Sequence, residues 1–187
     1  MKNLTFNLEA ESTNCQSLDF RTTRLRLIRL FAFLSIFLTG LSSSAQELKE
    51  MGKTLAAMKS SPDSTVVREA MHLENLVYEL NPYVIIREGI FSTYADAPFV
   101  CVDIDAQSVN KLKEPNILFD QAELLTVRIN TQNDLNILLD LASLNGFSKL
   151  KYINFLCSID CTREHVSKLI KMSKTGINVL YLISIPS

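Results

Sequence analysis

The sequence predicts an α/β protein: a short strand–helix repeat array with a mostly parallel sheet, helices on one face and an N-terminal helical hairpin as a cap. Three observations support this class. A six-residue apolar pattern recurs in the second half of the chain, apolar residues at helical spacing lie between its copies, and two amphipathic segments precede them. Strand–helix–strand connections of this length make neighbouring strands parallel.

The recurring pattern has apolar residues at its first, fourth and sixth positions. Its copies begin at residues 99, 124, 150 and 177, so successive starts are 25, 26 and 27 residues apart. The copies are rich in Val, Ile and Tyr, which favour strands. A period of roughly 20 to 50 residues usually indicates stacked supersecondary units. The copies span Phe99–Ile104, Leu124–Ile129, Leu150–Phe155 and Ile177–Leu182.

Residues 1–45 are predicted to be a leader that contains a signal peptide. An arginine-rich segment over residues 21–29 precedes an apolar run over residues 30–41, and small residues follow at Ser43 and Ala45. This order of a basic segment, a short apolar segment and small residues is typical of secretory signals. We expect cleavage after Ala45 and a mature protein that is secreted or periplasmic.

The alternative for the leader is an uncleaved membrane anchor over residues 24–41. The apolar run is shorter than the roughly 20 residues that cross a bilayer comfortably, which favours a cleaved signal. A polar stretch stands ahead of the arginines, and initiation near Leu25 or Leu27 would account for it.

Residues 46–187 are predicted to form a single α/β domain of 142 residues. The leader holds five Lys and Arg and three Asp and Glu, which leaves 14 and 17 in the mature chain, a net charge of −3. Nucleic-acid-binding proteins carry a clustered basic patch, so we expect no nucleic-acid partner. The sequence also lacks a Gly-rich phosphate loop and the common hydrolase and calcium-loop motifs. We therefore expect no cofactor and favour a non-catalytic protein.

Residues 46–81 are predicted to be the helical cap. Apolar residues three and four apart predict a helix over residues 46–59 and a second that runs to about Leu80. The segment between them contains Pro and Ser, which suit a helix start, and Asn81-Pro82 ends the second helix. We expect this hairpin to cover the open end of the strand array, because repeat stacks need such a cap.

Residues 82–187 are predicted to be the strand–helix units. Tyr83–Phe91 reads as one strand with a bulge at Gly89. The turn-like segment after it is short, so this strand and Phe99–Asp105 are expected to pair antiparallel.

Two helices are predicted between the later strands, over residues 131–144 and 162–174, from apolar residues at helical spacing. Thr131 and Asp134 resemble a capping box at the start of the first, and Asn145-Gly146 would end it.

The last strand, Ile177–Ile185, is apolar on both faces. Such a strand belongs inside a sheet, which raises the alternative of a compact two-layer α/β sandwich with this strand central. A strand of this kind at an edge would be covered by another chain, so an oligomer through the C-terminal strand is the remaining possibility.

The apolar pattern resembles that of the leucine-rich repeat family, L-x-x-L-x-L with a period of roughly 20 to 29 residues. The resemblance covers residues 99–187. The family's pattern continues with Asn or Cys, where this chain has Gln132 and Ser158, with Asn133 and Cys157 one residue away. The resemblance implies stacked strand–helix units, and the departure leaves out the family's ladder of buried Asn.

Equivalent positions of the parallel strands would form two rows on an exposed face. The first row is Cys101, Thr126, Tyr152 and Val179, and the second is Asp103, Arg128, Asn154 and Tyr181. Asp103 would form an ion pair with Arg128. Tyr, Arg, Asn and Asp are common in recognition surfaces, so we expect a binding surface for a protein or cell-surface ligand. Its predicted members are Asp103, Arg128, Tyr152, Asn154 and Tyr181.

Two other functions are considered from the sequence. Cys157, Cys161 and His165 are four residues apart, a spacing that metal ligands use, with Asp160 or Cys101 as a further ligand of a metal-binding or thiol redox protein. In an exported protein, a Cys157–Cys161 disulfide or buried apolar thiols are the alternatives.

A hydrolase with carboxylates at Asp103 and Asp105 is the remaining function considered. Both side chains point to the same face of one strand. No positioned base or nucleophile accompanies them in the sequence, so we favour an exported binding module over this hydrolase.

Overall fold

A computed structural model describes residues 47–171 and 176–185. The chain divides into two units, Met1–Ser44 and Ala45–Ser187, and the described residues belong to the second. The predicted leader, the cleavage site after Ala45 and the alternative anchor over residues 24–41 lie outside the described residues. Among the helices that are described, none is long and apolar enough to cross a membrane.

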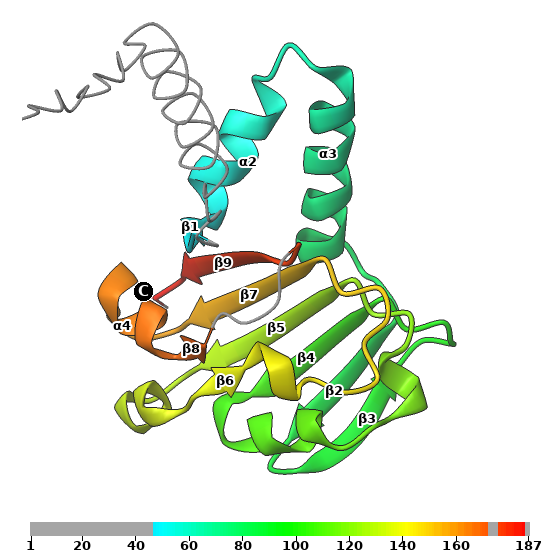
Figure 1. Ribbon diagram of the computed structural model, residues 1–187, viewed down its shortest axis with the longest axis vertical. Coiled ribbons are helices and arrows are strands. Elements are labelled where there is room, and N and C mark those ends of the chain that lie inside the picture. Colours follow the sequence, from blue (N-terminus) through cyan, green and yellow to red (C-terminus); the bar gives the residue numbers. More distant parts are fainter. Residues whose placement is uncertain (1–46, 172–175, 186–187) are drawn as a thin grey trace, which may run out of the picture. The chain divides into compact units, whose positions relative to one another are not determined.

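Seven strands of the described chain form one sheet, in the order β1-β9-β7-β5-β4-β2-β3 (Figure 1). Neighbouring strands are parallel except for β2 and β3. The predicted α/β class with a mostly parallel sheet is confirmed. The strands are β1 (Lys49–Glu50), β2 (Tyr83–Arg87), β3 (Ile90–Tyr94), β4 (Cys101–Asp105), β5 (Leu124–Ile129), β7 (Tyr152–Cys157) and β9 (Asn178–Ile183).

The four copies of the apolar pattern lie on β4, β5, β7 and β9, which are adjacent and parallel in the sheet. The segments between them return the chain along one face of the sheet, here called the crossover face. Its core contains alternate residues of the strands, such as Val102, Val127 and Phe155. Phe119 and Phe147 stack over this core with ring centroids 4.8 Å apart. Full burial of an apolar side chain, as in Phe119 and Phe155, contributes about 1.5–3 kcal/mol.

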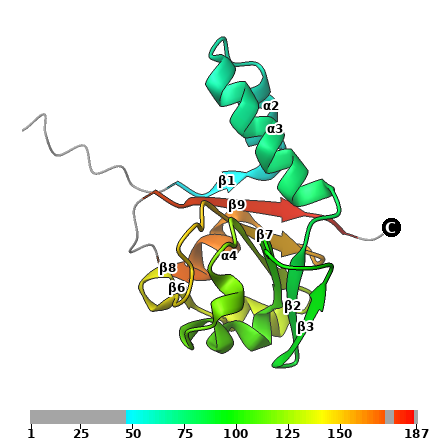
Figure 2. The same cartoon turned by 90° about the vertical axis from the view of Figure 1, so that its right-hand side faces the viewer.

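The helical hairpin covers the opposite face, here called the hairpin face (Figure 2). It consists of α2 (Met51–Lys59) and α3 (Ser64–Tyr78), and the Asp63 side chain caps α3 by accepting from the Thr65 N–H at 2.8 Å. Met51, Leu55, Leu73 and Leu76 pack there on the first residues of three strands, which are Cys101, Leu124 and Tyr152. The hairpin therefore covers the start of these strands and leaves their carboxyl ends uncovered on this face.

The prediction of one bulged strand over Tyr83–Phe91 is wrong. The chain turns at Glu88 and Gly89, with φ angles of 51° and 76°, and β3 returns antiparallel to β2. This return brings the chain back to the start of β2, so β4 pairs with β2 in parallel rather than antiparallel.

The predicted helix over residues 131–144 is also wrong. A 3₁₀ helix occupies Gln132–Asn136, the short strand β6 (Leu139–Asp140) follows, and a second 3₁₀ turn occupies Leu141–Ser143. The predicted capping box is nevertheless present, because Asp134 accepts hydrogen bonds from the N–H groups of Asn130 and Thr131.

The predicted helix over residues 162–174 is shorter in the structure. The helix α4 spans Arg163–Lys168, and β8 (Ile170–Lys171) follows and pairs with β6 in a second small sheet. Residues 172–175, where the helix was predicted to end, lie outside the described residues.

The last strand lies inside the sheet, as its two apolar faces predict. β9 runs between β7 and β1, with Val179 in the core of the crossover face and Leu180 in that of the hairpin face. The outer edge of β9 pairs with Lys49 and Glu50. An oligomer through this strand stays a prediction.

Candidate binding groove

A groove of about 510 Å³ lies on the hairpin face, over the uncovered carboxyl ends of the strands. Six strands and the end of α3 contribute residues to its lining. The groove is open because the hairpin stops short of this part of the sheet. The lining residues are Val77, Tyr78, Leu80, Tyr83, Ile85, Tyr94, Asp103, Thr126, Arg128, Asn154, Leu156, Leu182 and Ser184.

Asp103 is held between two arginines in this region. Arg128 Nε donates to Asp103 Oδ1 at 2.9 Å and its Nη2 donates to Oδ2 at 2.7 Å, while Arg87 Nη2 lies 2.9 Å from Oδ1. The predicted ion pair between Asp103 and Arg128 is therefore present. The register pairs Asp103 with Thr126, so Arg128 reaches it diagonally across the sheet. Asp103 is only 8% exposed, and its two partners compensate for the burial of its charge.

The Arg128 guanidinium keeps unused hydrogen-bond donors. The group has five N–H bonds, and its contacts with Asp103 occupy the Nε and Nη2 side. In the described part of the chain Nη1 has no hydrogen-bond partner, and the side chain is 37% exposed. Hydrogen bonds to Asp103 raise the pKa of Arg128, so the charge is permanent. Asp105 is a second carboxylate beside the two arginines, since it lies opposite Arg128 in the register and Arg87 helps to lower its pKa.

Asn154 lines the groove and carries an unpaired polar atom. The residue lies opposite Thr126 in the register and is 2% exposed, and its Oδ1 has no hydrogen-bond partner in the structure of the described chain. Buried polar atoms are nearly always paired, and an unpaired one costs about 1–3 kcal/mol. The groove therefore contains an acceptor that lacks a donor.

The rest of the groove is apolar and aromatic. Leu156 and Leu182 are half-buried in its floor, while Tyr78, Leu80 and Tyr94 are exposed around it, with Leu80 at 85% exposure. Burial raises the pKa of Tyr83 to about 12, and its hydroxyl donates to the Leu76 carbonyl at 3.3 Å. The groove combines a charged group, an unpaired amide and an apolar surface.

The structure brings together three of the five predicted binding residues, Asp103, Arg128 and Asn154. Tyr152 lies on the same face but is buried beneath the hairpin, where its hydroxyl donates to Glu69 Oε1 at 2.9 Å. Burial, reinforced by Glu69, raises the pKa of Tyr152, so this phenol stays protonated. Tyr152 is a packing residue outside the groove.

The predicted position of Tyr181 on the binding face is wrong. The equivalence of the repeats would place it beside Asn154, but the register pairs it with Phe155, on the crossover face. A slip of one residue moves every side chain of a strand to the other face, and β9 has slipped by one relative to β7. Tyr181 packs against the core of the crossover face instead.

Several groove residues could not be predicted from the repeat. Tyr78, Leu80 and Tyr94 come from the hairpin and from β3, outside the repeated segments. Arg87 lies on the strand beside Asp103 and contacts it. This contact was not predicted, because residues 83–91 were expected to form one strand that pairs antiparallel with the strand of Asp103. Tyr78, an exposed aromatic residue near the end of the predicted helix, was the available signal.

Cys157, Cys161 and His165 do not form a shared site in the structure. Both cysteines are buried free thiols, and burial, together with the neighbouring Cys161 thiol, raises the pKa of Cys157. His165 is exposed, and its Nδ1 accepts from the Thr162 N–H at 3.3 Å. Among the described residues, no group of three or more His, Cys, Asp or Glu is placed to hold a metal ion. The Cys157–Cys161 disulfide stays a prediction that thiol titration of the denatured protein would test.

The remaining predicted ligand and carboxylate have structural partners. Cys101 is buried beneath α3, where burial raises its pKa to about 12 and its Sγ lies 3.6 Å from the Leu76 carbonyl. Asp105 accepts from the N–H groups of Ser108 at 2.8 Å and Glu88 at 2.6 Å. Burial alone would raise the pKa of Asp105, but these hydrogen bonds outweigh it and lower the pKa. Neither feature favours a hydrolase.

Comparison of the chain with protein-family models, with curated proteins and with solved structures gives no match in any of the three. The resemblance to the leucine-rich repeat family therefore stays an expectation. The geometry of the groove is the basis for any functional proposal.

Proposed function

We propose that this protein is an exported, non-catalytic binding module and that the groove on the hairpin face is its contact surface. Export rests on the predicted leader over residues 1–45. The observation that carries the binding function is the Oδ1 of Asn154, which lacks a partner within the described chain and belongs to a buried residue of the groove lining. A bound ligand would supply the missing donor.

The position of the groove supports this function. In open α/β sheets, ligands bind beyond the carboxyl ends of the strands. Arg128, Leu156 and Leu182 lie near the carboxyl ends of β5, β7 and β9. Asp103 and Asn154 lie nearer the middle of β4 and β7, where the hairpin leaves the sheet uncovered. The parallel strands therefore bring groups from distant parts of the chain to one place.

The composition of the groove supports the same function. Arginine and tyrosine are over-represented among the residues that dominate binding energy, and an apolar surface with a few placed polar groups is typical of ligand sites. Arg128 is held by Asp103, so its orientation is fixed before a ligand arrives. Such preorganisation reduces the entropy that binding costs.

The test is chemical-shift mapping of the purified protein by two-dimensional NMR with a mixed set of small fragments. The set contains sugars, amino-acid derivatives, nucleosides and fatty acids. We expect the amide signals of Thr126, Arg128 and Asn154 to shift with the fragments that bind. We also expect these shifts to disappear in Asn154→Val and to persist in Asn133→Val, which changes an exposed Asn that does not line the groove.

Two results would overturn the proposal. One is that no fragment perturbs the groove at concentrations that saturate ordinary fragment sites. The other is that all perturbations map to another part of the molecule and are the same in both variants.

A further inference from the structure

We infer that the groove recognises an apolar amino-acid unit with a free carboxylate and an acylated nitrogen, the chemistry of a peptide C-terminus or of an N-acylated apolar amino acid. This inference rests on the proposed function and names its ligand class. Three parts of the groove support it, and each is complementary to a different part of such a ligand.

The carboxylate follows from Arg128. Its guanidinium is oriented by Asp103 and retains N–H donors on Nη1 that have no partner among the described residues. A planar guanidinium matches a carboxylate with two parallel hydrogen bonds.

The acylated nitrogen follows from Asn154. Its unpaired Oδ1 is an acceptor, so a ligand that pairs it presents an N–H donor. Asn154 and Arg128 are diagonal neighbours on adjacent strands, a relation that places Cα atoms roughly 7–8 Å apart. An amide N–H and the carboxylate of the same amino-acid residue are close enough to be bound together by two such side chains.

The apolar substituent follows from the remaining surface. Leu156 and Leu182 in the floor, with Leu80 and Tyr94 around them, form an apolar surface beside the polar groups. The volume of about 510 Å³ suits one or a few amino-acid residues. It lies within the roughly 300–1,000 Å³ that is usual for small-ligand sites.

The test is a set of titrations of the purified full chain with matched probes, followed by NMR or calorimetry. N-acetyl-leucine carries all three features. N-acetyl-leucinamide lacks the carboxylate, 4-methylpentanoate lacks the N–H, and N-acetyl-glycine lacks the apolar side chain. Since a hydrogen bond to a charged group contributes about 1.5–3 kcal/mol, we expect the amide probe to bind at least roughly tenfold more weakly than the acid.

Variants of the chain separate the contributions. Asn154→Val is expected to weaken the binding of N-acetyl-leucine at least roughly threefold, because a neutral hydrogen bond contributes about 1 kcal/mol. It should also make the affinities for N-acetyl-leucine and 4-methylpentanoate equal. Arg128→Gln is expected to remove the preference for the acid over the amide. Asn133→Val is the matched control and should bind as the unchanged protein does.

A further pair of probes identifies the source of the ligand. If a short peptide that ends in leucine binds at least roughly tenfold more tightly than N-acetyl-leucine, and its C-terminal amide does not, the ligand is a chain end. Equal binding of the two acids identifies a small molecule. Both results support the inference.

The inference is overturned if the amide binds as well as the acid, if inorganic phosphate displaces N-acetyl-leucine with higher affinity, or if Asn154→Val leaves the acid's binding unchanged. It is also overturned if no probe of this set binds. In these cases fragments of another class that still map to the groove would leave the proposed binding function standing, whereas the absence of any groove ligand would remove both.

Discussion

Asn154 occupies a central strand of a parallel sheet, a position where a β-branched apolar residue would normally pack. Its neighbours in β7, Ile153 and Phe155, are buried apolar residues on the other face. On the hairpin face the Asn carries an unpaired oxygen at 2% exposure. Local features that reduce stability without compensation within the fold are most often found at functional sites.

Replacement of Asn154 with Val should therefore stabilise the protein. The change removes a buried acceptor without a donor, so we expect the free energy of unfolding to rise by about 1–2 kcal/mol. Urea denaturation measures this directly, with Asn133→Val as a control that should stay within about 0.5 kcal/mol of the original. A loss of stability in Asn154→Val would mean that the amide has a structural partner after all.

Asp103→Asn should destabilise the protein, because it leaves Arg87 and Arg128 facing each other without the carboxylate that both contact. Both arginines are more than one third exposed, so water screens part of the effect, and we expect a loss of about 1–3 kcal/mol. Asp63→Asn is the matched control, since Asn caps a helix as well as Asp does. Equal stability of the two variants would contradict the proposed role of Asp103.

At the residue scale, the sequence predicted the contact of Asp103 with Arg128 but not its geometry. Alternation along each strand was sufficient to place Asp103, Arg128 and Asn154 on one face. It could not place Tyr181, because the relative register of β7 and β9 depends on packing with both neighbours rather than on the repeat. Repeat spacings of 25, 26 and 27 residues leave this register open by one residue.

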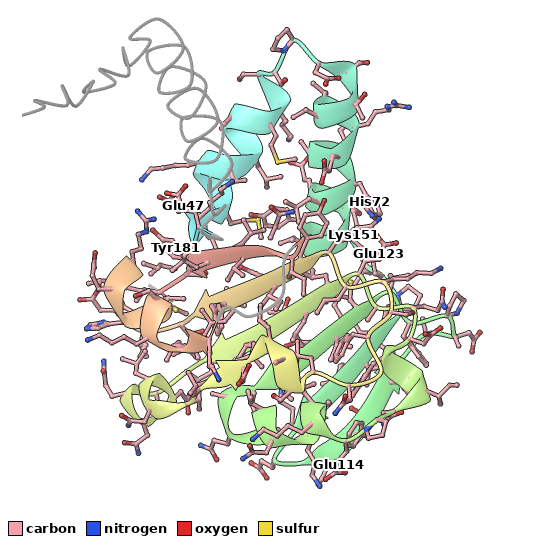
Figure 3. All side chains as sticks on the ribbon, viewed as in Figure 1. Glu47, His72, Glu114, Glu123, Lys151 and Tyr181 are labelled. Carbon is pink, nitrogen blue, oxygen red and sulfur yellow. The ribbon has the colours of Figure 1, made fainter. Side chains whose placement is uncertain are left out.

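At the scale of elements, a charged cluster connects α3 to the sheet (Figure 3). Glu123, just before β5, lies 2.8 Å from His72 Nε2 of α3 and accepts from Lys151 Nζ, just before β7, at 2.8 Å. Burial alone would raise the pKa of Glu123, but the hydrogen bonds from Lys151 and His72 outweigh it and lower the pKa. The hairpin is thus held on the sheet by polar contacts as well as by its apolar core.

The lowered pKa of Glu123 predicts how stability depends on pH. The folded state favours the carboxylate form of Glu123. Its contribution to stability is therefore fully present above the pKa of a Glu in the unfolded chain, which is about 4.3. It is lost as the pH falls through the folded pKa. Glu123→Gln should remove part of the loss of stability seen between roughly pH 7 and roughly pH 3, by less than about 1 kcal/mol. An unchanged dependence of stability on pH in this variant would contradict the proposed contribution of Glu123.

A small substitution at Gly146 should have a large effect on stability. Its φ is +84°, and a Cβ there would lie 2.7 Å from the carbonyl oxygen of Asn116. Gly146→Ala should therefore lower the free energy of unfolding by more than about 2 kcal/mol. In α2, Gly52 has its nearest neighbour 3.9 Å from such a Cβ, so Gly52→Ala should instead stabilise the protein by about 0.5–1 kcal/mol. Similar changes in the free energy of unfolding for the two variants would contradict the positive φ and the close contact at Gly146.

The wrong predictions of secondary structure have identifiable physical causes at this scale. Glu88-Gly89 forms the β2–β3 turn with a positive φ at a glutamate, so the Asn-Gly or Asp-Gly signal of a tight hairpin is missing. In the segment over residues 131–144, helical spacing was ambiguous, since short apolar runs do not distinguish a helix from extended chain. Leu139 and Leu141 reach the core from an extended segment and a 3₁₀ turn.

At the scale of the whole molecule, the periodic pattern was sufficient to predict the α/β class and four adjacent parallel strands. It could not predict that the hairpin would take the face opposite the crossovers. That choice depends on Leu124, Tyr152 and Leu180, which make the start of the hairpin face apolar, whereas Asp103, Arg128 and Asn154 place polar groups farther along the strands. The groove exists because the hairpin covers one of these regions and not the other.

The leader predicts the length of the mature chain. If residues 1–45 are a secretory signal, the intact mass of protein recovered outside the cytoplasm should correspond to a chain that begins at Gln46. Mass spectrometry of the fractionated protein tests this. Recovery of a chain that retains residues 24–41 in the membrane fraction would instead support the anchor.

In this account, the groove is a binding site in which the unpaired amide oxygen of Asn154 reduces stability until a ligand is bound. The most direct test is the thermal unfolding of the original protein and of Asn154→Val, each with and without N-acetyl-leucine. We expect the variant to unfold at the higher temperature without ligand, and the ligand to raise the midpoint of the original protein but much less that of the variant. A variant that is less stable, or that gains as much from the ligand as the original protein does, would contradict the account.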